Sequence, residues 1–170
     1  ICGKSKFSKR YLYLMEAIKS TNIGLDIVGS GEDLKNIKDY VKKNNIDVKF
    51  LGVVPNDQVS EILNKYSIFV LPSFYEGNPK VLLEAMSCGL AVVGSNIPGI
   101  NKIIVNNYNG VLFNNTSISL CYELNALISD ANRIKRLGKN ARKYAIENCS
   151  LESYTNFLSH KYKLILSNNN

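Results

Sequence analysis

The chain has 170 residues, which is enough for one globular domain and too few for two of ordinary size. Hydrophobic residues make up 45% and charged residues 21% of it, as in a soluble domain, and no apolar run approaches the roughly 20 residues of a membrane span. The net charge of +7 favours anionic partners such as nucleotides, acidic membrane surfaces or nucleic acid, although a lysine-rich surface without a partner is equally consistent with it.

The first residues, "ICGKS", are typical of a strand that turns into a loop, and no signal-peptide pattern begins the chain. We therefore expect this sequence to be part of a longer protein. The cysteines are scattered, without a C-x-x-C pair, and only His160 could join them in binding a metal. We accordingly expect reduced thiols, a cytoplasmic location and no metal site.

Short β-branched runs alternate with amphipathic helical stretches along the chain. After the opening run, strands are predicted at residues 25–29, 48–52, 67–72, 91–95 and 110–113. Helices are predicted at residues 32–45, at 56–66 with Asn56 or Asp57 as the cap, and at 79–88. Three more helices are predicted at 118–130, at 131–149 and from 151 on, with 167–170 as a disordered tail. Nearly continuous apolar strands separated by helices predict an α/β fold, a Rossmann-like doubly wound parallel sheet with C-terminal helices.

In such sheets, ligands bind beside the carboxyl ends of the strands, and the loop "SFYEGNPKVLLEAM" follows one of these ends. Asn78 is expected to cap the next helix and Pro79 to occupy its first turn, so that free N–H groups at the helix start form an anion site. Glu84, one and a half turns further on, has two acceptor oxygens for the vicinal diol of a ribose. Glu76, beside flexible Gly77, can accept from other sugar hydroxyls. The pattern suits a nucleotide-sugar.

A simpler interpretation remains open for both acids. Glu84 follows Lys80 by four residues and could form a surface ion pair, and Glu76 could simply favour the positive helix end. The basic residues after the opening strand, which include Lys4 and Lys9, could neutralise a diphosphate or form a solvated loop.

The run "GSGED", which begins at Gly29, has a G-x-G turn but lacks the third glycine of the dinucleotide fingerprint. No acid clearly takes the ribose role at the spacing expected for NAD, so a dehydrogenase is disfavoured. A sugar-nucleotide epimerase of similar architecture would need additional acid and histidine groups, which the sequence does not offer.

The order of these features resembles the donor-binding, C-terminal half of the retaining glycosyltransferases of family four, also called group one, which have the two-domain GT-B fold. The resemblance covers nearly the whole chain. It is carried by "CGKSKFSKRYLYLMEAI", "LDIVGSGED", "VKFLGVVPNDQV", "YSIFVLPSFYEGNPKVLLEAMSCGLAVVGSNIPGINKII", "NGVLF" and "RIKRLGKNARKYAIENCSLESY". Its specific part is the E-x7-E spacing from Glu76 to Glu84.

The resemblance implies a role for each matching residue. Glu84 would hold the ribose hydroxyls, whereas Glu76 would contact the transferred sugar and help to position its anomeric carbon. Lys4 and Lys9 would grip the diphosphate and, with Glu76, form the catalytic group. The residues implied in donor binding are Glu84, Asn78, Lys80, Val81, Gly77 and Gly29, with the backbone amides of Lys80 and Val81 completing the diphosphate grip. The family generally needs no metal or other cofactor.

This sequence also departs from the family pattern. Lys4 stands where an arginine is usual, which keeps the charge and loses the bidentate geometry. Pro79 has no N–H to offer the sugar, as glycine would have at that position.

The resemblance predicts residues 1–166 as the donor-binding domain of a retaining hexosyltransferase that uses an NDP-sugar. The acceptor would be a glycan or a lipid-linked molecule in polysaccharide biosynthesis. The N-terminal acceptor domain is expected to be absent from this chain, which would then be inactive alone. No nucleic acid is expected as a partner, and peripheral association with the inner face of the membrane is open. The alternative is a non-catalytic nucleotide-sugar-binding or interaction module.

Overall fold

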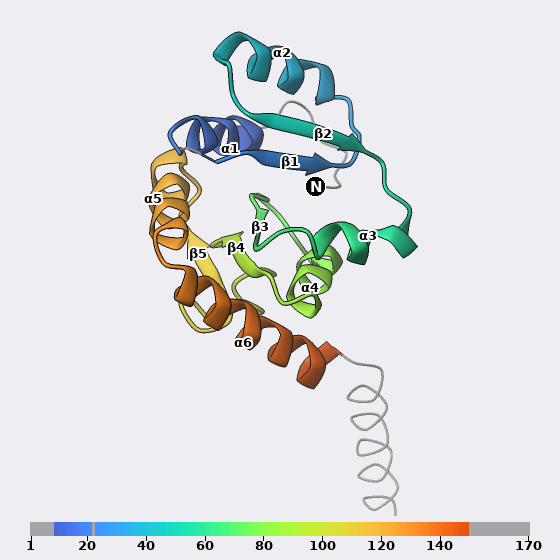
Figure 1. Ribbon diagram of the computed structural model, residues 1–170, viewed down its shortest axis with the longest axis vertical. Helices are drawn as coiled ribbons and strands as arrows, with labels where there is room; N and C mark the ends of the chain where they lie inside the picture. Colours follow the sequence, from blue (N-terminus) through green and yellow to red (C-terminus); the bar gives the residue numbers. More distant parts are fainter. Residues whose placement is uncertain (1–8, 22, 150–170) are drawn as a thin grey trace, which may run out of the picture.

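The structure, a computed structural model, describes residues 9–21 and 23–149 (Figure 1). Its helices are α1 (Lys9–Lys19), α2 (Leu34–Asn44), α3 (Asn56–Leu63), α4 (Lys80–Ser87), α5 (Ser117–Ile128) and α6 (Ala131–Cys149). Its strands are β1 (Leu25–Val28), β2 (Val48–Gly52), β3 (Ile68–Leu71), β4 (Ala91–Ser95) and β5 (Val111–Phe113). The strand predicted at the start of the chain, the helix predicted after Cys149, His160 and the predicted tail lie outside the described residues.

The described strands pair in parallel, as the alternation of strands and helices predicts, but they form two sheets where a single sheet was predicted. β1 pairs with β2, and β4 lies between β3 and β5. Within the three-stranded sheet, Phe69 lies opposite Val92 and Val93 lies opposite Val111. The loops that follow β3, β4 and β5 therefore leave the same edge of this sheet.

Neighbouring residues of β4 face opposite sides of the sheet, because side chains alternate along a strand. Val93 packs into a core with buried residues of α1 and α5, and this core also contains Ile27 of β1. Val92 packs into a second core with buried residues of α4 and α6. Both faces of the sheet are thus covered, and one core joins it to the β1–β2 pair (Figure 1). The predicted doubly wound arrangement is confirmed.

The cap residues of two helices differ from the sequence prediction. Asn56 or Asp57 was expected to cap α3 and Asn78 to cap α4, but Pro55 and Pro79 hold the cap positions, without a side-chain cap bond. Both prolines have a non-helical ψ, 145° at Pro55 and 82° at Pro79, so each helix begins at the residue after its proline. At α4, the Asn78 carbonyl, not its side chain, accepts the N–H of Lys80 at 2.9 Å.

A hydrogen bond links the end of the α3 segment to β1. The Tyr66 hydroxyl donates to Oδ2 of Asp26 at 2.5 Å. This bond, together with partial burial and the negative charge of Asp26, raises the pKa of Tyr66 from 10.0 to about 12. Since the neutral phenol is favoured in the folded protein, the stability from this bond is present below pH 10 and is lost as the pH rises towards 12.

We expect Tyr66→Phe to lower the free energy of unfolding by about 0.5–1 kcal/mol at pH 7. The estimate is at the low end for a bond to a charged group because Tyr66 is 37% exposed. Urea denaturation measures the difference, with Tyr122→Phe, a more exposed tyrosine of α5, as the control. The difference should shrink between pH 10 and pH 12, and a difference that grew over that range would contradict the role of the bond.

Candidate functional site

The loop between β3 and α4 carries most of the predicted site residues. Glu76, Gly77 and Asn78 lie in this loop, Lys80 and Val81 open α4, and Glu84 lies one turn further along the helix. The loop between β3 and α4 covers residues 72–79, and the buried Pro72 and Pro79 restrict the backbone at its two ends. The E-x7-E pair therefore sits at the carboxyl edge of the three-stranded sheet, as the sequence predicts.

The two glutamates have different surroundings. Glu76 is half-buried, and its Oε1 accepts the Ser73 hydroxyl at 2.6 Å. Glu84 is exposed, and its carboxylate forms no hydrogen bond or ion pair within residues 9–21 and 23–149. The surface pair between Lys80 and Glu84 that the spacing allowed is thus not formed. In the described part of the chain, both oxygens of Glu84 and Oε2 of Glu76 therefore have no hydrogen-bond partner.

The start of α4 offers fewer backbone donors than a regular helix end. Lys80 donates to the Asn78 carbonyl at 2.9 Å, and Leu82 and Leu83 donate to the Pro79 carbonyl at 3.0 and 3.3 Å. In the described part of the chain, the N–H of Val81 has no backbone acceptor. Among the described residues, Lys80 thus has a backbone acceptor for its amide and Val81 has none, so of the two amides predicted to bind a diphosphate the Val81 amide is available.

The thiol of Cys88, just after α4, lies near both a carboxylate and a guanidinium. Burial raises the pKa of this thiol; the Arg142 charge opposes the rise and the Glu84 charge adds to it. The thiol therefore stays protonated at neutral pH and is not a reactive nucleophile. Within residues 9–21 and 23–149, no three histidine, cysteine or acidic side chains cluster so as to hold a metal ion.

The remaining predicted residues are placed less completely. Lys4 and the side chain of Lys9 lie outside the described part, although Lys9 is the first residue of α1. Gly29 follows β1 with a φ of 125° and donates its N–H to the Gly52 carbonyl at 2.7 Å, so its hydrogen bond is made within the β1–β2 edge. The structure brings the two acids together with Lys80 and Val81 at the start of α4.

Two supports of the loop were not predicted from the sequence. The ring of Tyr13 in α1 meets the ring of Phe74 edge-on, with centroids 5.8 Å apart, and Ser73 binds Glu76. The Tyr13 contact has no local sequence signal. The Ser73 contact is indicated by the S-x-x-E spacing from Ser73 to Glu76, because within a turn a side chain can reach the residue three positions away.

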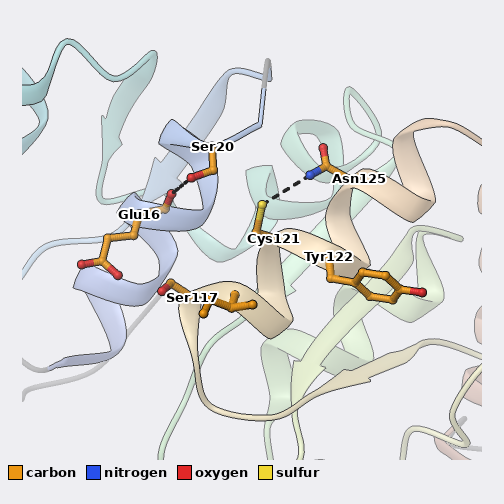
Figure 2. Close-up of a pocket in the computed structure, with 7 residues that line it drawn as sticks. Glu16, Ser20, Ser117, Cys121, Tyr122 and Asn125 are labelled. Atoms are coloured by element: carbon orange, nitrogen blue, oxygen red, sulfur yellow. Dashed lines mark hydrogen bonds between the residues drawn. The ribbon is translucent and has the colours of Figure 1, made fainter.

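A groove of about 520 Å³ lies elsewhere, between α1 and α5 (Figure 2). Its lining residues are Glu16, Ser20, Ser117, Ile118, Cys121, Tyr122 and Asn125. Figure 2 shows that Ser20 bonds to the Glu16 carbonyl and Asn125 to the Cys121 sulfur, so these polar groups already have partners on their own helices. None of the predicted site residues lines this groove, and it is not part of the candidate site.

The fold and the sequence can be compared with known proteins. The Anabaena protein HepE, solved in complex with UDP and glucose, aligns with a TM-score of 0.82 at 19% identity, over 94% of this chain and 47% of that one. This likeness, which concerns the fold alone, confirms the predicted Rossmann-like half of a GT-B architecture.

The sequence comparisons show the family to which the chain belongs. Residues 2–144 match the family described as "Glycosyl transferases group 1". An uncharacterized glycosyltransferase of Methanocaldococcus jannaschii is 32% identical over 134 residues, 78% of this chain and 38% of that protein. A UDP-Gal:alpha-D-GlcNAc-diphosphoundecaprenol alpha-1,3-galactosyltransferase of Escherichia coli is 32% identical over 142 residues, 79% of this chain and 37% of that protein. The chain belongs to the group 1 glycosyltransferases, and it spans less than two fifths of the length of these two relatives. No helix in the described residues is long and apolar enough to cross a membrane.

Proposed function

We propose that this chain binds a nucleotide-sugar and serves as the donor half of a retaining glycosyltransferase. The observation that carries the proposal is the pair of acids at one sheet edge. Within the described residues, Glu76 and Glu84 have carboxylate oxygens without a partner, and the N–H of Val81, on the same loop and helix, has no backbone acceptor. Two acceptors for hydroxyl pairs next to an anion-binding amide match the chemistry of a sugar joined to a ribose through a diphosphate.

In this proposal each group has one task. Glu84 accepts the ribose hydroxyls, and Glu76 accepts hydroxyls of the transferred sugar. Gly77 has open space where a side chain would stand, so the sugar can approach the backbone, and the exposed Asn78 amide can meet its hydroxyls in place of the N–H that Pro79 lacks. Gly29 borders the donor at the end of β1.

The diphosphate would be held by the Val81 amide, together with Lys4 and Lys9. Negative charge grows on the leaving diphosphate as the bond to the sugar breaks, so donors already in place there stabilise the transition state more than the bound substrate. This electrostatic stabilisation needs no metal ion, and we propose a metal-independent reaction on a hexose.

The proposed acceptor is inferred from the relatives and not from residues of this chain. The Escherichia coli relative is named for transfer to a diphosphoundecaprenol-linked sugar, and both relatives extend well beyond the matched region. We propose a lipid-linked or glycan acceptor in polysaccharide biosynthesis at the cytoplasmic side of the membrane. Its binding site and the complete activity would require sequence outside this chain.

Calorimetric titration with UDP, GDP and ADP tests the proposed nucleotide site. One of the three should bind, and Glu84→Ala should raise its Kd at least about 10-fold, the loss expected for hydrogen bonds to a charged group. Lys9→Ala should weaken binding as well. The control is Glu147→Ala, which removes an exposed acid of α6 that pairs with Lys143 at 3.8 Å.

If Glu84→Ala bound the nucleotide with the same Kd as Glu147→Ala, Glu84 would have no role in holding the ribose. If none of the three nucleotides bound at millimolar concentration, this chain would not carry a donor site on its own, and the non-catalytic interaction module would be the better description.

A further inference from the structure

Ser73 supports the side chain of Glu76. The Ser73 hydroxyl, in a residue only 3% exposed, donates to Oε1 of Glu76 at 2.6 Å. Ser73 follows the end of β3 with only the buried Pro72 between them, so the strand fixes where the hydroxyl lies. The bond stops free rotation of the carboxylate and leaves Oε2 without a partner in the described part of the chain.

Gly99 supports the backbone of the same glutamate. A Cβ atom on Gly99 would lie 2.1 Å from the carbonyl oxygen of Glu76, and the φ of Gly99 is +94°, a conformation that favours glycine. The loop around Gly99 is held firmly, because Ile97 and Ile100 on either side are buried in the core against α4 and α6. The loop after β4 therefore packs directly against the loop after β3 at Glu76.

These two contacts act on one group from two directions. A carboxylate that must accept hydroxyls of a sugar in one geometry loses much of its effect when it can turn away. Neither contact involves Glu84, which lies on α4 and would hold the ribose, so the supports of the two acids are separate.

We propose that Ser73 and Gly99 are positioning residues that fix the Glu76 carboxylate for the hydroxyls of the donor sugar. The proposal rests on the proposed function. Its consequence is that these residues govern the contribution of the sugar to donor affinity and leave the contribution of the nucleotide unchanged. We call this contribution the sugar increment: the Kd of the nucleotide divided by the Kd of its sugar form.

The sugar increment is measured by calorimetry on the 170-residue chain with three pairs: UDP and UDP-glucose, GDP and GDP-mannose, and ADP and ADP-glucose. The pair that binds the unaltered chain most tightly then serves for the variants. Ser73→Ala should reduce the sugar increment about 5- to 10-fold, less than the loss of a hydrogen bond to a charged group because the Glu76 carboxylate itself remains, while the Kd of the nucleotide alone stays within about 2-fold. Ser73→Thr, which keeps the hydroxyl, should restore most of the increment.

Two further variants separate positioning from general damage. Ser87→Ala removes an exposed hydroxyl that bonds to the Leu83 carbonyl at 2.8 Å at the far end of α4, and it should leave both Kd values unchanged. Gly99→Ala pushes on the Glu76 backbone instead of its side chain, and it should lower the sugar increment in the same direction as Ser73→Ala.

The outcomes distinguish this proposal from the one on which it rests. If a nucleotide bound but Ser73→Ala weakened the nucleotide and its sugar form equally, Ser73 would only support the fold and the inference would be overturned. A Glu76→Ala variant with the sugar increment of the unaltered chain would overturn it as well, because Glu76 would then do nothing for the sugar. Absence of all nucleotide binding would remove the proposed function, and this inference with it.

Discussion

Replacing Gly138 with alanine is expected to lower the free energy of unfolding by about 2 kcal/mol. Gly138 lies in the interior of α6, where alanine is favoured over glycine by about 1 kcal/mol, so helix propensity alone predicts stabilisation. A Cβ atom at this position, however, would lie 2.1 Å from the carbonyl oxygen of Gly89 and 3.1 Å from its carbonyl carbon. The two effects have opposite signs, and their magnitudes decide the result.

The close contact should prevail because the obstacle is backbone. Gly89 lies in the turn between α4 and β4, with a φ of +79° and its N–H bonded to the Met86 carbonyl at 2.9 Å, so its carbonyl cannot swing aside like the end of a long side chain. Relief requires α6 to move away from α4 and β4, where Ala141 and Ala145 are buried. Overpacking of this kind costs about 3 kcal/mol, which leaves about 2 after the gain in propensity.

Urea denaturation followed by circular dichroism measures the change, which corresponds to a Tm lower by about 4–8 °C for a domain of this size. The control is Gly77→Ala, because a Cβ atom at Gly77 would meet nothing within 4 Å, and its effect should stay within about 0.5 kcal/mol. If Gly138→Ala were as stable as the unaltered chain or more so, α6 would not approach Gly89 this closely and propensity would dominate.

This glycine illustrates what the sequence could not provide. In "RLGKNA" it looks like a weak point of a helix, and the contact that requires it lies in a distant part of the chain. The strand runs are different, because each apolar run is bounded by glycine, proline or polar residues and its pattern depends only on its own residues. For that reason β2 and β4 begin and end where the sequence predicts, whereas the cap residues of α3 and α4 differ from the prediction.

In the candidate site, too, features that depend on local sequence were predicted and features that depend on distant contacts were not. The spacing of Glu76 and Glu84 and the helix that carries Glu84 follow from local pattern, and the structure places both acids at the predicted edge. Whether Lys80 would pair with Glu84 could not be decided locally, since i,i+4 pairs on an exposed helix gain only tenths of a kcal/mol. The support from Gly99 depends on how two loops meet across the sheet edge, and no local spacing encodes that.

Replacing Asn109 with alanine is expected to lower the free energy of unfolding by about 2–3 kcal/mol. Asn109 is fully buried just before β5. Its Oδ1 accepts the N–H of Val105 at 2.7 Å, and its Nδ2 donates to the Ile103 carbonyl at 3.0 Å. Alanine would leave both backbone groups without their partner and would open a small cavity, and such losses cost about 1 kcal/mol or more each.

The control for this prediction is Asn101→Ala, which removes an exposed amide that donates to Asn96 at 3.2 Å and should change stability by less than about 0.5 kcal/mol. The two asparagines differ in burial, so equal effects from both variants would contradict the argument. The consequence reaches the candidate site through β5, because the Phe113 carbonyl accepts the N–H of Asn96 at 2.9 Å at the start of the loop that carries Gly99. Loosening the turn before β5 should therefore also weaken the support of Glu76, and Asn109→Ala should lower the sugar increment as Gly99→Ala does.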